Sequence, residues 1–307
     1  MTASSSRHDA ATASPPDDMA VRIRSLVADP RFDAVLGLAI ADILAFHRDR
    51  GWLARIFADR GHAIGSAAAV YLHYVTRMPG EEPGLTVGRF QALCAEMGFC
   101  SPGRASALLS LMRLARFLKP GEPGADRRIR LLQPTEKLLD IQWQRWSCFL
   151  PGAALALNVP ARDLVERLER TQEPIAVMAR RAGRRFMEGF RLLRYAPELV
   201  PMAERDGGIQ VLSLLYAAGL TAGAEPDSRK PTSVSAIAAS LGVSRAHVRK
   251  LLHAATEAGL LVRTEGAELL APSATLVVAL RQFYATVFIL LADAACDVVP
   301  VRAHSWR

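Results

Sequence analysis

The chain has 307 residues, of which 50% are hydrophobic and 22% are charged. This length suffices for one large domain or two ordinary ones, and this composition excludes a chain that is disordered throughout. Lys and Arg number 38 against 30 Asp and Glu, which gives a formal net charge of +8. A basic protein suggests a polyanionic partner, although charge alone does not identify it.

The composition of the N-terminus and the length of the apolar runs indicate whether the chain is secreted or crosses a membrane. Residues 1–20 are rich in Ser, Ala, Thr, Pro and Asp, which predicts a disordered tail without the apolar centre of a secretory signal. No apolar run reaches the roughly 18 residues of a membrane helix. The longest, 283–292, predicts a buried helix between Arg281 and Asp293. We therefore expect a cytoplasmic protein that has no membrane partner.

Helical periodicity dominates the rest of the chain. Apolar residues recur at spacings of three and four over 33–57 and 65–75, and two further helical runs over 160–195 are separated by Glu173-Pro174. Strands are few, with candidates at 129–132 and around 260–263. The predicted fold class is mainly α with short two-stranded hairpins.

The most informative feature is an internal repeat, with one copy at 85–135 and another at 233–273. Ser101 of the first copy matches Ser244 of the second. Four apolar positions follow at one constant offset, namely Ala105, Leu108, Leu109 and Met112 against Val248, Leu251, Leu252 and Ala255. Each copy then has a polar, Gly-containing excursion that closes at Pro-Thr or Pro-Ser.

The second copy predicts two capped helices and a hairpin. Ser233 can cap a first helix that ends at Gly242, and Ser244 can cap a second. Along the second helix, one face is apolar and the opposite face is polar and basic. The segment AGLLVRTEGAELLAPS reads as a helix end, a strand, a tight turn and a strand. The first copy has the same pattern, but its turn at 98–101 is one residue longer.

This pattern, above all IAASLGVSRAHVRKLL, resembles the winged helix-turn-helix of bacterial transcription regulators and is most similar to the MarR-like group. The resemblance implies two winged-helix units braced by long helices, and sequence-specific binding of double-stranded DNA for transcriptional control. A small-molecule effector and a homodimer are further partners that stay open. The rival hypotheses are a protein-interaction scaffold built on winged helices, and a nonspecific nucleoid-type DNA-binding protein.

Candidate DNA contacts follow from the physics of the groove. The major groove, about 12 Å wide, admits one helix, and a helix N-terminus attracts phosphate. In the second copy the candidates are Ser244, Arg245, His247, Arg249, Lys250 and His253. In the first copy they are Ser101, Arg104, Ser106 and Ser110 on the helix, with Arg127, Arg128 and Arg130 in the basic wing. Each of these sets could instead be a solvated face.

The expected domains are a tail at 1–20, a first unit with flanking helices at 21–150, linker helices at 151–206, and a second unit with a C-terminal helix at 207–307. The linker carries six arginines between 180 and 194, which either contact phosphate or are solvated. Trp143, Trp146 and Phe149 favour helix packing over an effector pocket.

Nothing in the sequence indicates catalysis. There is no GxSxG, no P-loop, no HExxH and no GxGxxG after a strand. The histidine spacings do not form a metal set, and the cysteines, which lack a CxxC pair, predict buried thiols in a reducing compartment. We expect a protein that is not an enzyme and that has no cofactor and no metal.

Overall fold

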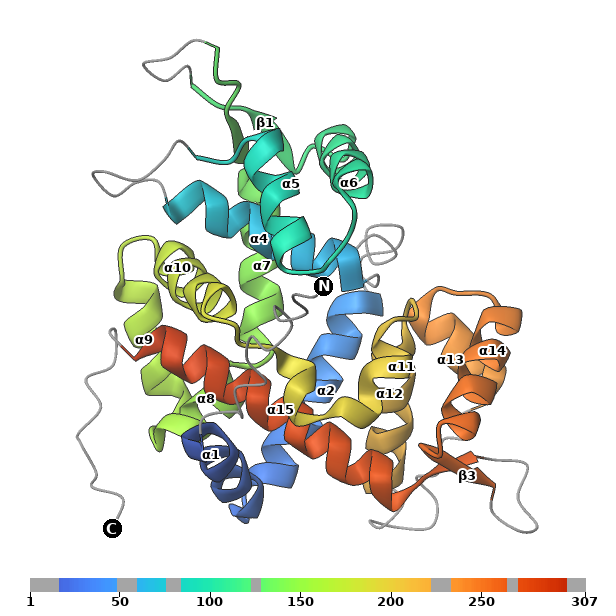
Figure 1. Cartoon of the computed structure of the whole chain (residues 1–307). Coiled ribbons are helices and arrows are strands. Elements are labelled where there is room, and N and C mark those ends of the chain that lie inside the picture. The colour runs from blue at the N-terminus through green and yellow to red at the C-terminus, as the bar shows by residue number, and fades with distance from the viewer. Residues whose placement is uncertain are drawn as a thin grey trace, which may run out of the picture.

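The computed structural model describes residues 17–48, 60–75, 84–122, 128–221, 233–263 and 270–296. Within these residues the protein is mainly helical, with fourteen α-helices, two short 3-10 helices and two antiparallel sheets of two strands each (Figure 1). The prediction of a mainly α fold with short hairpins is therefore confirmed.

The elements of the N-terminal half are α1 (Asp17–Ala28), α2 (Phe32–Arg48), α4 (Arg60–Val75), α5 (Val87–Glu96), α6 (Pro102–Leu114), β1 (Leu118–Pro120), β2 (Leu132–Pro134) and α7 (Glu136–Ser147). The middle of the chain forms α8 (Leu150–Leu157), α9 (Ala161–Arg170), α10 (Pro174–Met187), η1 (Leu192–Tyr195), η2 (Pro197–Leu199) and α11 (Val200–Ala203). The C-terminal part forms α12 (Gly208–Thr221), α13 (Val234–Leu241), α14 (Arg245–Glu257), β3 (Leu261–Arg263), β4 (Leu270–Pro272) and α15 (Ala274–Ala295).

Several boundaries differ from the sequence prediction. The predicted tail 1–20 overlaps α1, which begins at Asp17, and Met19 is only 2% exposed because it packs in the core. Residues 1–16 lie outside the described residues, as do 49–57 of the helix expected at 33–57. The strand expected at 129–132 lies later, since β2 begins at Leu132. The helix break at Glu173-Pro174 is confirmed, with Pro174 as the first residue of α10.

Two segments repeat the same order of elements, from α4 to α7 and from α12 to α15. Ser101 caps α6 and Ser244 caps α14, and each hydroxyl accepts a hydrogen bond from the backbone N–H three residues later, at 3.4 and 3.1 Å. Gly98 and Gly242 each have φ of 65° in the preceding turn, a conformation that favours glycine. The predicted caps and turns are therefore present in both copies.

The two hairpins also match. β1 pairs with β2 and β3 pairs with β4 in the same register. The N–H of Thr135 donates to the Phe117 carbonyl at 2.9 Å, and the N–H of Ser273 donates to the Leu260 carbonyl at 3.0 Å. Phe117 and Leu260 are both fully buried. Each hairpin is thus fixed to its own helix pair by the same bond and the same apolar anchor.

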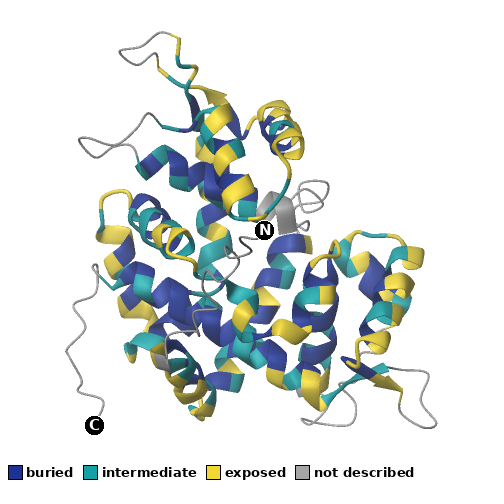
Figure 2. Ribbon diagram, viewed as in Figure 1, coloured by how far each residue is buried: buried dark blue, intermediate teal, exposed yellow. Residues whose placement is uncertain are grey.

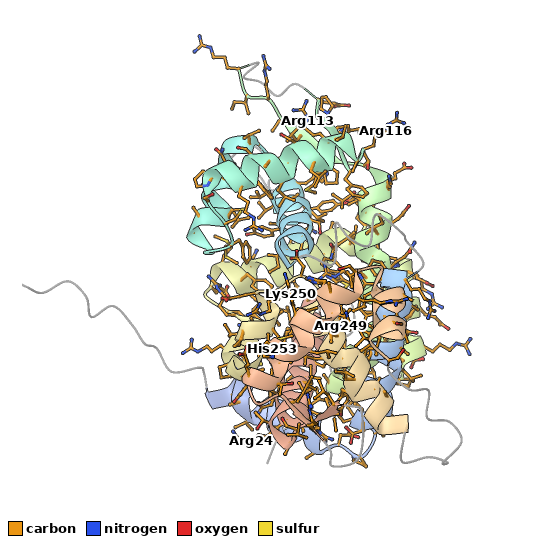
Figure 3. All side chains as sticks on the ribbon, turned by 90° about the vertical axis from the view of Figure 1, so that its right-hand side faces the viewer. Arg24, Arg113, Arg116, Arg249, Lys250 and His253 are labelled. Carbon is orange, nitrogen blue, oxygen red and sulfur yellow. The ribbon has the colours of Figure 1, made fainter. Side chains whose placement is uncertain are left out.

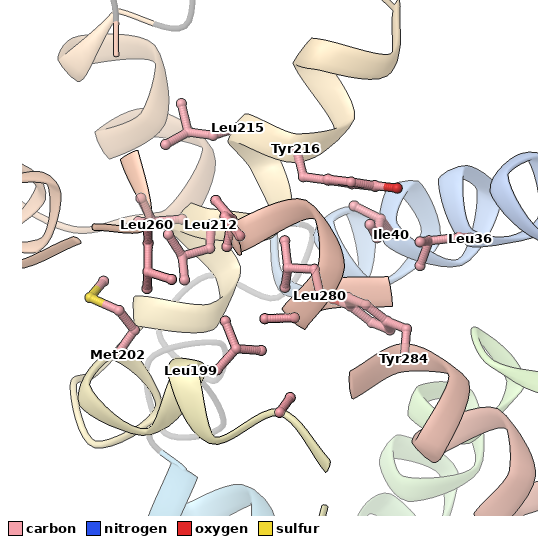
Figure 4. Packing of buried hydrophobic residues seen from close by; sticks show 14 of the residues in the cluster. Leu36, Ile40, Leu199, Met202, Leu212, Leu215, Tyr216, Leu260, Leu280 and Tyr284 are labelled. Atoms are coloured by element: carbon pink, nitrogen blue, oxygen red, sulfur yellow. The ribbon is translucent and has the colours of Figure 1, made fainter. Parts of the chain in front are cut away.

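The apolar core crosses the expected domain boundaries at 150 and 206. Ile40 of α2 packs in one cluster with Leu212 of α12 and Leu280 of α15 (Figure 4). Phe46, one and a half turns later in α2, belongs instead to the cluster of α4 to α7. Buried residues consequently run through the middle of the molecule without a break between the two repeats (Figure 2).

Helix α15 corrects one sequence expectation. The sequence predicted no segment long and apolar enough to cross a membrane. Among the described residues, α15 meets that criterion by its length and composition. A core helix meets the same criterion, and α15 packs against α8, α10 and α1. The two charged residues of α15 that flank the apolar run 283–292 are paired: Arg281 with Asp33 and Asp293 with Arg22, each at 2.6 Å. These contacts favour a core helix, as the sequence predicted for 283–292.

Candidate nucleic-acid interface

Helix α14 presents a basic face to solvent. Val248, Leu251 and Ala255 are buried on its inner side, where the helix packs against α11, α12 and α13. Arg245 and Arg249 lie four residues apart on the exposed side, and Lys250 lies beside them. None of these three cations has a hydrogen-bond or ion-pair partner within the described part of the chain. Their charge is therefore available to an external anion.

The other three candidates on this helix have contacts within the protein. The Ser244 hydroxyl is used as the cap. The half-buried His247 donates from Nε2 to the backbone carbonyl of Asp206 at 2.8 Å, which ties α14 to the segment before α12. The exposed His253 has its Nε2 3.3 Å from the Glu257 carboxylate. The sequence predicted that His247 faces solvent, but its ring instead contacts the segment before α12 and helps to position α14.

Helix α6 of the first copy has the same capping geometry but lacks the basic face. Positions equivalent to those of α14 lie 143 residues earlier, as Ser101 does relative to Ser244. Arg245, Arg249 and Lys250 are thereby replaced with Pro102, Ser106 and Ala107. The Ser106 hydroxyl accepts a hydrogen bond from Gln91 Nε2 at 2.7 Å, so it serves the contact between α5 and α6. Arg104 and Ser110 are exposed.

Two arginines at the end of α6 were missed by the sequence reading. Arg113 and Arg116 are exposed, and they lie on the same side of the molecule as Arg249, Lys250 and His253 (Figure 3). Arg113 is one helical turn beyond Ser110, so extending the candidate face by one turn would have found it. Between them, Leu114 is 82% exposed, which leaves a large apolar side chain next to two cations.

Two of the three predicted wing arginines lie in the loop of the first hairpin. Arg128 and Arg130 are exposed and precede β2, which starts at Leu132. Arg127 lies outside the described residues. Arg128 and Arg130 thus lie shortly before the second strand of the hairpin.

The remaining predicted features concern aromatic and thiol groups. Trp143 and Trp146 of α7 are half-buried and pack against two apolar clusters together with Phe149, which supports the packing interpretation.

Cys94 and Cys148 are buried as expected, but Cys100 and Cys296 are only half-buried. Burial, with Cys100 close by, raises the pKa of the Cys94 thiol to about 12. Among the described residues, no three His, Cys, Asp or Glu side chains gather as metal ligands would.

Both capped helices lie on the same side of the molecule. In Figure 1, α6 and α14 lie along one side of the molecule, and Figure 3 views that side directly. No family model, curated protein or solved structure matches the chain.

Proposed function

We propose that this chain is a sequence-specific, double-stranded-DNA-binding transcription regulator built on two winged helix-turn-helix units. The observation that carries the proposal is the α14 face, where Arg245, Arg249 and Lys250 are exposed and without partners in the described chain. This face sits on a capped helix-turn-helix with a hairpin, an arrangement that the chain contains twice. The expected location of such a protein is the cytoplasm, on the nucleoid.

The proposed mechanism is insertion of α14 into the major groove. The groove admits one helix, and an arginine fork matches the O6 and N7 acceptors of guanine. Arg245 and Arg249 supply two such forks one turn apart, and one bidentate pair gives about 1–3 kcal/mol of discrimination between bases. The free N–H groups at the start of α14 favour a nearby phosphate.

The first unit would contact the backbone and not the bases. Its helix lacks cations at the three positions that are basic in α14, and its exposed arginines include Arg113, Arg116, Arg128 and Arg130, at the helix end and in the hairpin loop. Phosphate contacts of this kind set position and orientation but carry no sequence information. One chain would thus hold a reading unit and a positioning unit, with both helices on one side.

The test is selection of genomic DNA fragments by the purified chain at about 150 mM salt. We expect one enriched motif, bound roughly 10³-fold or more above bulk DNA. The double variant Arg245→Ala/Arg249→Ala should lose that preference. Arg162→Ala is the matched control, because Arg162 is an exposed arginine on α9 that pairs with Glu166. Site preference that survives the double variant would reject the role given to α14.

One observation favours a second candidate, a protein-interaction scaffold. Leu114 at the end of α6 is 82% exposed, and large exposed apolar side chains can mark a surface that contacts proteins. Failure to recover any DNA fragment would favour this scaffold. Uniform recovery of fragments, with a steep dependence on salt, would favour a nonspecific nucleoid-type protein instead.

A further inference from the structure

An arginine-rich cavity of about 1010 Å³ lies among α1, α9, α10 and the C-terminal end of α15. Seven arginine and three carboxylate side chains line it, so the formal charge of the lining is +4. A concave site of this size is typical of small-molecule sites. The concentration of guanidinium groups specifies an anion as its occupant.

One carboxylate organises the arginines of the wall. Asp293 accepts hydrogen bonds from both terminal nitrogens of Arg22, at 2.6 and 3.2 Å, and its carboxylate lies 3.9 Å from Arg185. Arg181 donates to the Asp293 backbone carbonyl at 3.3 Å and to the Cys296 sulfur at 3.0 Å. These three arginines are held in position before any ligand arrives, which lowers the ordering cost of binding.

Two other guanidinium groups of the cavity, those of Arg180 and Arg184, have no carboxylate partner within the described residues. These two residues lie one turn apart on α10. Arg180 is half-buried, so part of its hydration is already lost. In addition, the Nε of Arg185 is buried without a hydrogen-bond acceptor. A buried donor without an acceptor is costly.

We propose that this cavity binds a small organic compound that carries two or more phosphate groups. Arginine forks match phosphate oxygens in pairs. A single phosphate carries about −1.5 to −2 at pH 7 and would leave about half of the lining charge of +4 unbalanced, so a compound with more than one phosphate matches the lining better. The elements around the cavity lie on the side of the molecule away from α6 and α14 (Figure 1). DNA held by those two helices would not reach it, so the phosphate comes from a small molecule.

The test is calorimetric titration of the full chain with inorganic tripolyphosphate, with orthophosphate as a second probe. We expect tripolyphosphate to bind more tightly than orthophosphate. The variant Arg180→Ala/Arg184→Ala should weaken tripolyphosphate binding at least tenfold. Arg162→Ala, which removes an arginine outside the cavity, should bind as the wild type does. No binding by the wild type, or equal affinity of the double variant and the control, would overturn the proposal.

A second variant and a DNA measurement complete the design. Arg180→Lys/Arg184→Lys keeps the charge but removes the forks, so its affinity should fall severalfold even if the alanine variant does not fold. Binding of the selected DNA without tripolyphosphate should be unchanged in either variant. A loss of DNA binding together with unchanged tripolyphosphate affinity would assign the arginines to the DNA backbone and overturn the proposal. The proposed DNA-binding function can fail without affecting the tripolyphosphate titration.

Discussion

Arg116 and Gly259 hold the same backbone position in the two repeats, with φ of 57° and 69°. Each follows the C-terminal turn of its helix and precedes the first strand of its hairpin. The N–H of Arg116 donates to Arg113 at 3.0 Å, and the N–H of Gly259 donates to Thr256 at 2.9 Å. A left-handed conformation costs a residue with a Cβ about 1–2 kcal/mol, whereas glycine adopts it freely. The first unit therefore carries an arginine in a strained position next to the surface proposed to contact phosphate.

Arg116→Gly should increase the free energy of unfolding by about 0.5–1 kcal/mol, because relief of strain exceeds the added entropy of the unfolded chain. Gly259→Ala should decrease it by about 1 kcal/mol. Urea unfolding followed by circular dichroism measures both. If Arg116 contacts phosphate, the glycine variant is also the weaker DNA binder. A stability loss in Arg116→Gly would show that its side chain has a structural role.

Removal of Arg249 should relax the sequence preference of DNA binding and leave its salt dependence nearly unchanged. Each neutralised phosphate contributes about −0.9 to the slope of log affinity against log salt concentration. If Arg249 reads a base, Arg249→Ala relaxes sequence preference and leaves the slope nearly unchanged; if it contacts phosphate, the slope falls by about 0.9. Our mechanism predicts the first result. Affinities measured from about 50 to 200 mM salt, on duplexes with the specific site and on random duplexes, distinguish base reading from phosphate contact.

The buried hydrogen bond between Ser213 and Tyr284 joins α12 to α15. Their hydroxyl oxygens are 2.8 Å apart, and the two residues are only 1% and 3% exposed. Ser213→Ala or Tyr284→Phe alone should cost about 1–3 kcal/mol, since each leaves a buried hydroxyl without its partner. The double variant should cost less than the sum of the two. Additive losses in a double-mutant cycle would mean that the bond contributes no coupling.

Two glycines should respond oppositely to the same substitution. A Cβ at Gly152 of α8 would overlap the Phe288 ring of α15, whereas one at Gly37 of α2 would meet no atom within 4 Å. Gly152→Ala should lower stability by about 1–3 kcal/mol through overpacking. Gly37→Ala should raise it by about 0.5–1 kcal/mol, because glycine weakens a helix interior. Thermal melting of both variants measures the contrast. Equal effects would show that α8 and α15 tolerate separation.

The cysteines should differ in reactivity. A pKa of about 12 for the buried Cys94 leaves about one thiolate in 10⁴ at pH 8. The half-buried Cys100 and Cys296 should therefore react with iodoacetamide well before Cys94 does, as peptide mass spectrometry of timed samples would show. Early modification of Cys94 would indicate that the packing around α5 opens in solution.

Local features of the fold could be read from the sequence. Ser101 and Ser244 are caps and Gly242 ends a helix because the required chemistry lies within three or four residues of each. The buried stripe of α14 follows from helical periodicity for the same reason. The exposed position of Arg245, Arg249 and Lys250 is the opposite side of that stripe, so it was predictable as well.

Contacts between distant residues could not be read in this way. His247 has the spacing of a solvent-facing residue, but it is held by a carbonyl 41 positions earlier. Asp293 and Arg22 are 271 positions apart, and no periodicity indicates that they meet. The expected domain boundary at 150 follows a change in pattern, yet Ile40 of α2 packs with the second repeat. Without an alignment of related sequences, tertiary packing of this kind leaves no local signal.

Helix α15 connects the second hairpin to the arginine-rich cavity. It follows β4 directly at one end, and at the other end its Asp293 holds the arginines of the cavity. Its 22 residues give a rod about 33 Å long. A tilt of about 5° around one end displaces the other by about 3 Å over such a length. A displacement of that size at the β4 end would disturb the proposed insertion of α14 into a DNA groove, because β4 pairs with β3, which follows α14 in the chain.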